Sequence, residues 1–230
     1  MATYKELQTY AKNIIQDSKY NHLLGGLINQ GQLEIAGGMP SALGSWLTPP
    51  LPGLFTIGTV DTATDAAYVS MPVDFQRNLQ FAASPEGNEI DIAETFISLV
   101  ETYPLLDKSG TVVECCEFGG NFYYQGIPTT SAEITVHYYK VPTDMSVDGS
   151  TPDGIPSHLQ ESLLGNYTVW NIGKLINKED IIHETNREVI ISASNRMMEI
   201  HRNLFIDALK ALELYIPYNH RNINLISENA

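Results

Sequence analysis

The chain of 230 residues is 43% hydrophobic and 17% charged, a composition that indicates a folded protein and not a disordered one. Its 27 Asp and Glu residues outnumber its 13 Lys and Arg residues, giving a formal net charge of -14 at pH 7. Because such a surface repels phosphate groups, tight nucleic-acid binding is disfavoured.

Two helical patterns open the chain. Apolar residues at steps of three and four predict a helix over residues 4–15 and a second helix over about residues 23–36. Gly37-Gly38-Met39-Pro40 is a stop signal for the second helix, so we expect an N-terminal helical hairpin. The first residues lack a basic segment followed by an apolar run, and we expect neither export nor a membrane span.

The middle of the chain is predicted to be rich in β-structure. Residues 47–53 contain three prolines and are expected to form a loop or linker. Helical spacing predicts a third helix at about 88–103. Residues 144–156, rich in Asp, Ser, Gly and Pro, are expected to form a surface loop that closes the β region. Alternating patterns predict five strands, of which the first two form a hairpin: 55–60, 67–72, 112–118, 122–125 and 132–141.

Helical patterns return towards the C-terminus. Pro156 suits the first position of a fourth helix, which apolar residues continue to about Ile176. The strongest pattern runs from Lys178 to Ile216, and at about 1.5 Å per residue this helix would exceed about 50 Å. Such a length is more than a compact domain needs, so we expect the helix to project or to line something.

Together these elements predict an α+β fold. A helical bundle, made of the N-terminal hairpin and two long C-terminal helices, is interrupted by an antiparallel β-rich insertion domain. We expect the helical domain at residues 1–46 and 156–216, the β-rich domain with its one helix at 47–155, and a C-terminal tail at 217–230.

Signatures of catalysis are scarce. The sequence has no P-loop and no G-x-S-x-G, H-E-x-x-H or G-x-G-x-x-G motif. Its six histidines are scattered without zinc-ligand spacing, so we expect no metal and no cofactor. Asp91 with Glu94, and Glu114 with Glu117, are close enough in sequence for acid-base chemistry, but solvated faces are the simpler interpretation.

The two cysteines are adjacent. A strand points Cys115 and Cys116 to opposite faces, and neither has a remote partner for a disulfide, so both are interpreted as reduced core residues. The alternative is a small Cys-dependent hydrolase in which His137 activates one thiol from a neighbouring strand. No local charge lowers the thiol pKa, and with the common motifs missing we expect a protein that is not an enzyme.

The long C-terminal helix carries a candidate subunit interface. Met197 and Met198 lie on it with Arg187, Arg196 and Arg202. Ordinary packing explains the methionines equally well.

Five segments carry a resemblance to a known family: 27–36 (LINQGQLEIA), 68–75 with 77–79 (YVSMPVDF, RNL), 124–128 (YQGIP), 136–146 (VHYYKVPTDMS) and 155–164 (IPSHLQESLL). With the order of the predicted elements, they resemble the head-to-tail adaptor (connector) proteins of tailed bacteriophages. The resemblance covers about residues 28–209, to within the few residues by which the ends of predicted elements vary.

This resemblance implies a structural virion protein in the phage neck, between capsid and tail, assembled in the host cytoplasm. Its subunits would form a homo-oligomeric ring of usually about twelve copies, with the helical part against the portal protein and the β part towards tail or nozzle proteins. Genomic DNA would pass through the lumen during ejection without specific binding, and no membrane is involved. The alternative within the same particle is another ring, such as a tail terminator or nozzle component.

The C-terminal tail is the expected portal contact. Residues 222–227 partly alternate polar and apolar side chains, which suits strand addition to a partner, although a frayed terminus has the same pattern. We expect Tyr218, Ile223, Leu225 and Ile226 to bind the portal.

Overall fold

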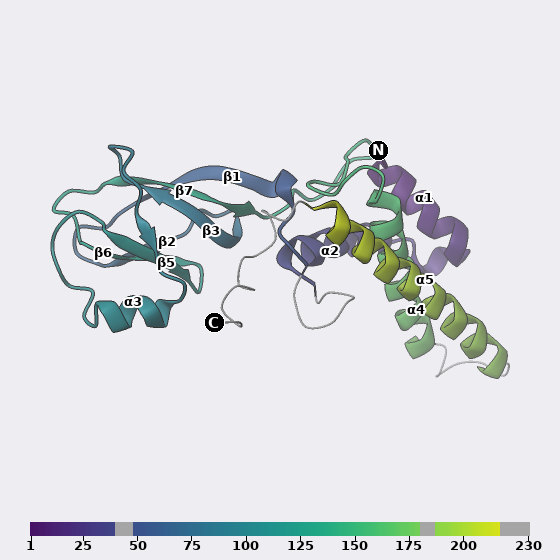
Figure 1. Cartoon of the computed structure of the whole chain (residues 1–230). Helices are drawn as coiled ribbons and strands as arrows, with labels where there is room; N and C mark the ends of the chain where they lie inside the picture. The colour runs from purple at the N-terminus through teal and green to yellow at the C-terminus, as the bar shows by residue number, and fades with distance from the viewer. Residues whose placement is uncertain (40–47, 180–186, 217–230) are drawn as a thin grey trace. The chain divides into compact units, whose positions relative to one another are not determined.

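The computed structural model describes residues 1–39, 48–179 and 187–216. Within these ranges the protein is a mixed α+β structure with five α-helices and two β-sheets (Figure 1). The helices are α1 (Tyr4–Ile15), α2 (Leu24–Gly37), α3 (Phe96–Thr102), α4 (Asn166–Glu179) and α5 (Arg187–Tyr215). The strands are β1 (Phe55–Asp61), β2 (Tyr68–Ser70), β3 (Phe75–Ala83), β4 (Asp91–Ile92), β5 (Glu114–Phe118), β6 (Asn121–Gln125) and β7 (Glu133–Lys140).

The chain divides into two compact units. The helical unit combines Met1–Gly53 with Pro142–Ala230, and the β unit is Leu54–Val141. The sequence suggests a β-rich domain at residues 47–155 between two helical segments. That these parts are independent domains stays a proposal.

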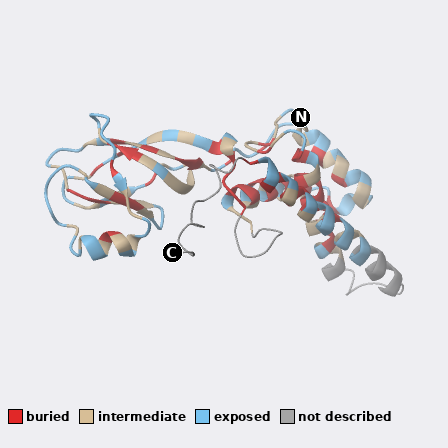
Figure 2. Cartoon of the chain, viewed as in Figure 1, coloured by how far each residue is buried: buried red, intermediate tan, exposed pale blue. Residues whose placement is uncertain are grey.

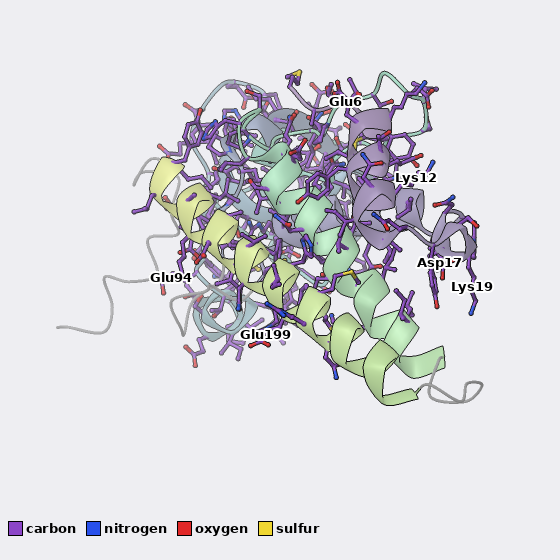
Figure 3. All side chains as sticks on the ribbon, turned by 90° about the vertical axis from the view of Figure 1, so that its right-hand side faces the viewer. Glu6, Lys12, Asp17, Lys19, Glu94 and Glu199 are labelled. Atoms are coloured by element: carbon purple, nitrogen blue, oxygen red, sulfur yellow. The ribbon has the colours of Figure 1, made fainter. Side chains whose placement is uncertain are left out.

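The helix α1 has the predicted bounds because both of its ends are capped. Thr3 and Glu6 form a capping box, and the C-cap residue Gln16 has left-handed backbone geometry. Glu6 in the first turn and Lys12 in the last turn also complement the helix dipole (Figure 3). The helix α2 ends at Gly37, and its C-cap residue Gly38 has a left-handed φ of 97°, as the glycine-rich stop signal predicts.

The helix α4 packs against α1, α2 and α5. It follows a π-helical turn, Glu161–Gly165, which holds Leu163 and Leu164 in the core. Of the two long C-terminal helices that the sequence predicts, only α5 is long, with 29 residues or about 43 Å, whereas α4 has 14 residues. The predicted continuous helix 178–216 includes residues 180–186, which lie outside the described residues.

The β unit contains two sheets with strand orders β1-β7-β3 and β2-β6-β5-β4. One core cluster contains residues of both sheets: Val60, Ala82, Ile134, Val136 and Tyr138 from the first, with Cys115, Phe122 and Tyr124 from the second. Side chains alternate along each strand, so each sheet also has an outer face.

The predicted hairpin of strands 55–60 and 67–72 is wrong. The strand β1 pairs with β7 and β2 pairs with β6, so the two strands lie in different sheets. Tyr124 holds the connection between them, because its hydroxyl accepts a hydrogen bond from the Ala63 amide at 2.8 Å and lies 2.8 Å from the Ala66 carbonyl.

Three further features differ from the predicted β region. The strand β3 was not predicted, because register shifts and a positive φ of 57° at Asn78 interrupt its alternation. The prediction of an antiparallel region is wrong at β4, which pairs with β5 in parallel. The helix α3 is shorter than the predicted 88–103, since β4 takes residues 91–92 and Thr95 caps the helix with Ser98.

Candidate interaction surfaces

The segment from Pro142 to Pro156 is held against the helices by amide side chains. Asn29 on α2 pairs with both backbone groups of Met145, at 3.0 and 3.1 Å. Gln32 on α2 donates to the Thr143 carbonyl at 2.9 Å and accepts from the Asp153 amide at 2.8 Å. By its contacts the segment belongs to the helical unit, and its predicted role in closing the β region stays a proposal.

Gln160 completes this arrangement from the end of the segment. Its side chain is fully buried, donates to the Ile155 carbonyl at 3.1 Å and accepts from the Ala2 amide at 2.8 Å. Buried backbone groups need such partners. Gln32 thus joins two segments that carry the family resemblance, 27–36 and 136–146, while Gln160 of the segment 155–164 bonds to Pro152, the neighbour of Asp153.

A concave surface of about 550 Å³ lies next to this network, where α5 ends. It is lined by Met1, Leu51–Gly53, Thr143, Thr151–Pro156, Tyr215 and Ile216. The ring of Tyr215 also lies 5.2 Å from that of His158. This end of α5 is thus built from segments distant in sequence.

The helix α5 has two apolar faces. One is buried and includes Phe205, Leu209 and Leu212. The other carries apolar residues that are exposed: Ile200 (47%), Leu204 (46%), Ala211 and Leu214 (81%). Figure 2 shows the exposed positions along α5.

The positions 200, 204, 207, 211 and 214 are spaced by four and three residues, as in the seam of a coiled coil. We call them the α5 stripe. Its one charged member, Asp207, is 2.9 Å from the ammonium group of Lys210. A seam of this kind suits packing against another helix or an apolar groove.

The methionines of α5 are partly buried against α4. A Cβ placed on Gly173 of α4 would be 3.2 Å from Cβ of Met198 and 3.6 Å from Cε of Met197. Close packing within the chain therefore accounts for both. Arg196 and Arg202 are exposed, while the side chain of Arg187 lies outside the described part.

The cysteines are buried and free, as predicted. Cys115 is 0% exposed and Cys116 is 1% exposed on β5. Burial raises the pKa of the Cys115 thiol well above its usual range and that of Cys116 to about 11, so neither forms a thiolate near neutral pH. His137 lies in the other sheet, on β7, with its ring 4.9 Å from Phe81. This arrangement opposes the Cys-dependent hydrolase.

The candidate carboxylates lie on β4, on β5 and just before α3. Asp91 on β4 is in register with Glu114 on β5, whereas Glu94 precedes α3 and is exposed. The Glu117 carboxylate accepts from the Gly120 amide at 3.1 Å and so stabilises the turn between β5 and β6. Since side chains alternate along β5, Glu114 and Glu117 lie on opposite faces, which opposes the acid-base alternative for this pair.

The predicted portal-binding residues Tyr218, Ile223, Leu225 and Ile226 lie outside the described residues. Sequence reasoning missed Asn29, Gln32 and Gln160 as anchors of the 142–156 segment. The signal in the sequence was the position of Gln32 on the apolar face of its helix. A buried amide at such a position needs hydrogen-bond partners.

Charge is unequal between the two units. Residues 54–141 contain twelve Asp and Glu but three Lys and Arg, so this stretch holds most of the excess negative charge. In the described ranges, no group of three or more His, Cys, Asp or Glu side chains is arranged to hold a metal ion. Among the helices described, none has the length and apolar character needed to cross a bilayer.

Comparison with known proteins identifies one family. The family model described as SU10 adaptor protein matches residues 2–212. No curated protein sequence matches the chain.

Proposed function

The chain belongs to the SU10 adaptor protein family, and from this premise we propose that it forms a head-to-tail adaptor ring that binds beneath the portal of a tailed phage, extends the DNA channel and docks the tail. The observation that carries the proposal is the span of the family match, which includes both the helical and the β unit. The protein would then be a structural component of the virion neck. No catalytic step is part of the proposal.

A ring of about twelve copies needs a heterologous contact, in which each subunit offers two unlike surfaces. The helical bundle supplies a candidate surface in the α5 stripe, where Ile200, Leu204 and Leu214 are exposed. This stripe would pack against the neighbouring subunit. The helical unit would lie against the portal and the β unit would face the tail or nozzle proteins.

The net negative charge of the chain would suit the wall of such a channel. A lumen that repels phosphate groups lets genomic DNA pass during ejection without binding it. The excess of Asp and Glu in residues 54–141 supports an assignment of part of the channel wall to the β unit.

The C-terminal tail is proposed to bind the portal through Tyr218, Ile223, Leu225 and Ile226. Residues 222–227 alternate polar and apolar side chains in part, which suits the addition of a strand to a sheet edge of the portal.

Native mass spectrometry of the purified chain, alone and with portal particles, tests the ring directly. We expect a closed ring of about twelve copies on the portal. Assembly on the portal alone agrees with the proposal, because the portal then acts as the template. Failure to assemble in both conditions would contradict it.

Electron cryomicroscopy of the virion tests the position of the ring. Density for the chain directly beneath the portal is the expected result. Density further along the tail would favour a tail terminator or nozzle component.

A further inference from the structure

Four aromatic side chains form a cluster on the outer face of the sheet β2-β6-β5. Tyr68 on β2 is in register with Tyr123 on β6, and their ring centroids are 5.5 Å apart. Phe96, the first residue of α3, lies 4.7 Å from Tyr123 and stacks on Phe118 of β5 at 5.0 Å with an angle of 14°. We call these four residues the aromatic platform. Figure 1 shows α3 beside this sheet.

The platform faces away from the core of the β unit. Val69 and Phe122, the pair next to Tyr68 and Tyr123, belong to the core cluster and its immediate packing. Since side chains alternate along a strand, Tyr68 and Tyr123 lie on the opposite face.

Two rings of the platform are open to solvent. Tyr68 is 52% exposed and Phe118 is 55% exposed, and the neighbouring Ile97 on α3 is 68% exposed. Aromatic side chains gathered at the surface mark interaction sites, because exposing them costs hydrophobic free energy. Ring–cation contacts occur at Tyr20, Tyr103 and Trp170, so the platform rings have none from the described part of the chain.

Carboxylates lie on or next to the elements that carry these rings. Asp91 and Glu114 are in register on β4 and β5, and Glu114 alternates onto the same face as Phe118. Glu94 is exposed two residues before Phe96, and Glu101 is exposed on α3. Electron-rich ring faces and negative charge at one place both attract cations.

We propose that the aromatic platform binds an extended segment of a partner protein that presents arginine side chains. A guanidinium group would stack on the open rings of Phe118 and Tyr68 and pair with the carboxylates nearby. Arginine suits the surface better than lysine, because its planar group is weakly hydrated and stacks on rings. The excess of Asp and Glu in this unit repels DNA and anionic lipid, which leaves a cationic protein segment as the occupant.

This inference rests on the proposed function, in which the β unit docks the tail. It adds the chemistry of the partner, which would be a tail-side protein with an arginine-bearing segment at the contact.

The probe is a synthetic peptide of alternating serine and arginine, titrated into the full chain and followed by the NMR shifts of backbone amides. We expect the arginine peptide to bind more tightly than the same peptide with lysine. The double variant Tyr68→Ser and Phe118→Ser should weaken binding by at least about fivefold, since each exposed cation–π contact contributes a small factor. Both positions are more than half exposed, so the variant should stay folded, with a melting temperature lowered only by the loss of the ring contacts to Tyr123 and Phe96.

The matched control is Ile57→Ser on β1, in the other sheet, where the side chain is 62% exposed. Its affinity for the peptide should equal that of the unchanged chain. Equal binding of the arginine and lysine peptides, or equal binding by the double variant, would overturn the proposal. Binding of maltohexaose to the same rings with no arginine preference would overturn it as well. The peptide is titrated into the free chain, whereas ring assembly is measured with the portal, so either idea can fail without the other.

Discussion

Gly26 and Gly31 stand five residues apart on α2 and have different surroundings. A Cβ on Gly31 would lie 2.6 Å from the ring of Tyr167 on α4, whereas a Cβ on Gly26 would have no atom within 4 Å. Neither glycine has a positive φ, so the two positions differ only in the space available for a side chain. The close approach of α2 and α4 therefore depends on Gly31.

We predict opposite effects of Gly31→Ala and Gly26→Ala on the free energy of unfolding. Gly31→Ala should destabilise the protein by about 1–3 kcal/mol, because the added methyl group forces the ring of Tyr167 to move. Gly26→Ala should stabilise it by up to about 1 kcal/mol, since alanine has the higher helix propensity. Urea unfolding measures both, and two shifts of the same sign would contradict the packing described.

A buried polar network joins α1, α4 and α5. The Oδ1 atom of Asn166 accepts from the hydroxyl of Tyr10 at 3.1 Å and lies 2.7 Å from Nδ1 of His201. His201 is 9% exposed, and burial lowers the pKa of its imidazole. Both contacts are satisfied by a neutral ring that carries its proton on Nδ1.

This network predicts a loss of stability in mild acid. The unfolded chain has a His201 pKa of about 6.5, and the folded pKa lies lower, so the unfolded state binds the proton first as pH falls. The contribution of His201 is complete above about pH 6.5 and is lost as the pH falls through the folded pKa. His201→Gln should reduce the slope of unfolding free energy against pH in this window. Identical slopes for the two proteins would exclude this role.

At the scale of elements, α5 combines a buried and an exposed apolar face in one helix. Such a helix is stable within the subunit through one face, which leaves the α5 stripe for a second contact. The aspartate within the stripe, Asp207, resembles the single polar residue that sets register in coiled coils.

We predict that the pair Leu204→Glu and Leu214→Glu blocks assembly of the ring but leaves the subunit folded. These side chains are 46% and 81% exposed, so their loss should change the unfolding free energy by no more than about 1 kcal/mol. The charges would oppose burial of the stripe in a contact between subunits. Asn203→Glu on the same helix is the control, since Asn203 is exposed outside the stripe. Native mass spectrometry with the portal compares ring assembly by the double variant and by the control. A normal ring from the double variant would exclude the α5 stripe as the contact between subunits.

At the scale of the whole molecule, an adaptor needs one end for each neighbour. The family match spans residues 2–212 and therefore stops before the tail residues Tyr218, Ile223, Leu225 and Ile226. We therefore propose that folding depends on residues 2–212 and that binding to the portal depends on the tail.

Deletion of residues 218–230 should leave the melting temperature unchanged and weaken co-sedimentation with portal particles. Replacing the four tail residues by serine should have the same effect, whereas Asn222→Ser with Asn224→Ser should not, because those two side chains alternate with Ile223 and Leu225. Unchanged co-sedimentation after the deletion would refute the tail as the portal contact.

The sequence by itself determined the elements whose signals are local. The 3.6-residue periodicity predicted α1 to its terminal residues, and period-two alternation located β5, β6 and β7 within a few positions. Burial of the adjacent cysteines also followed from a strand pattern. Local patterns of this kind report which face of an element is apolar.

Tertiary structure alone decided which elements meet. Alternation along a strand shows which side chains share a face, but it does not identify the neighbouring strand. The pairing of β1 with β7, and of β2 with β6, could therefore not be predicted from the alternation. The bulged strand β3 had too irregular an alternation to be predicted. The amide of Gln32 bonds to residues 111 and 121 positions away, and Tyr68 meets Phe118 and Phe96 through Tyr123 across three further elements. Such contacts form only when the whole chain folds, because their partners are distant in sequence.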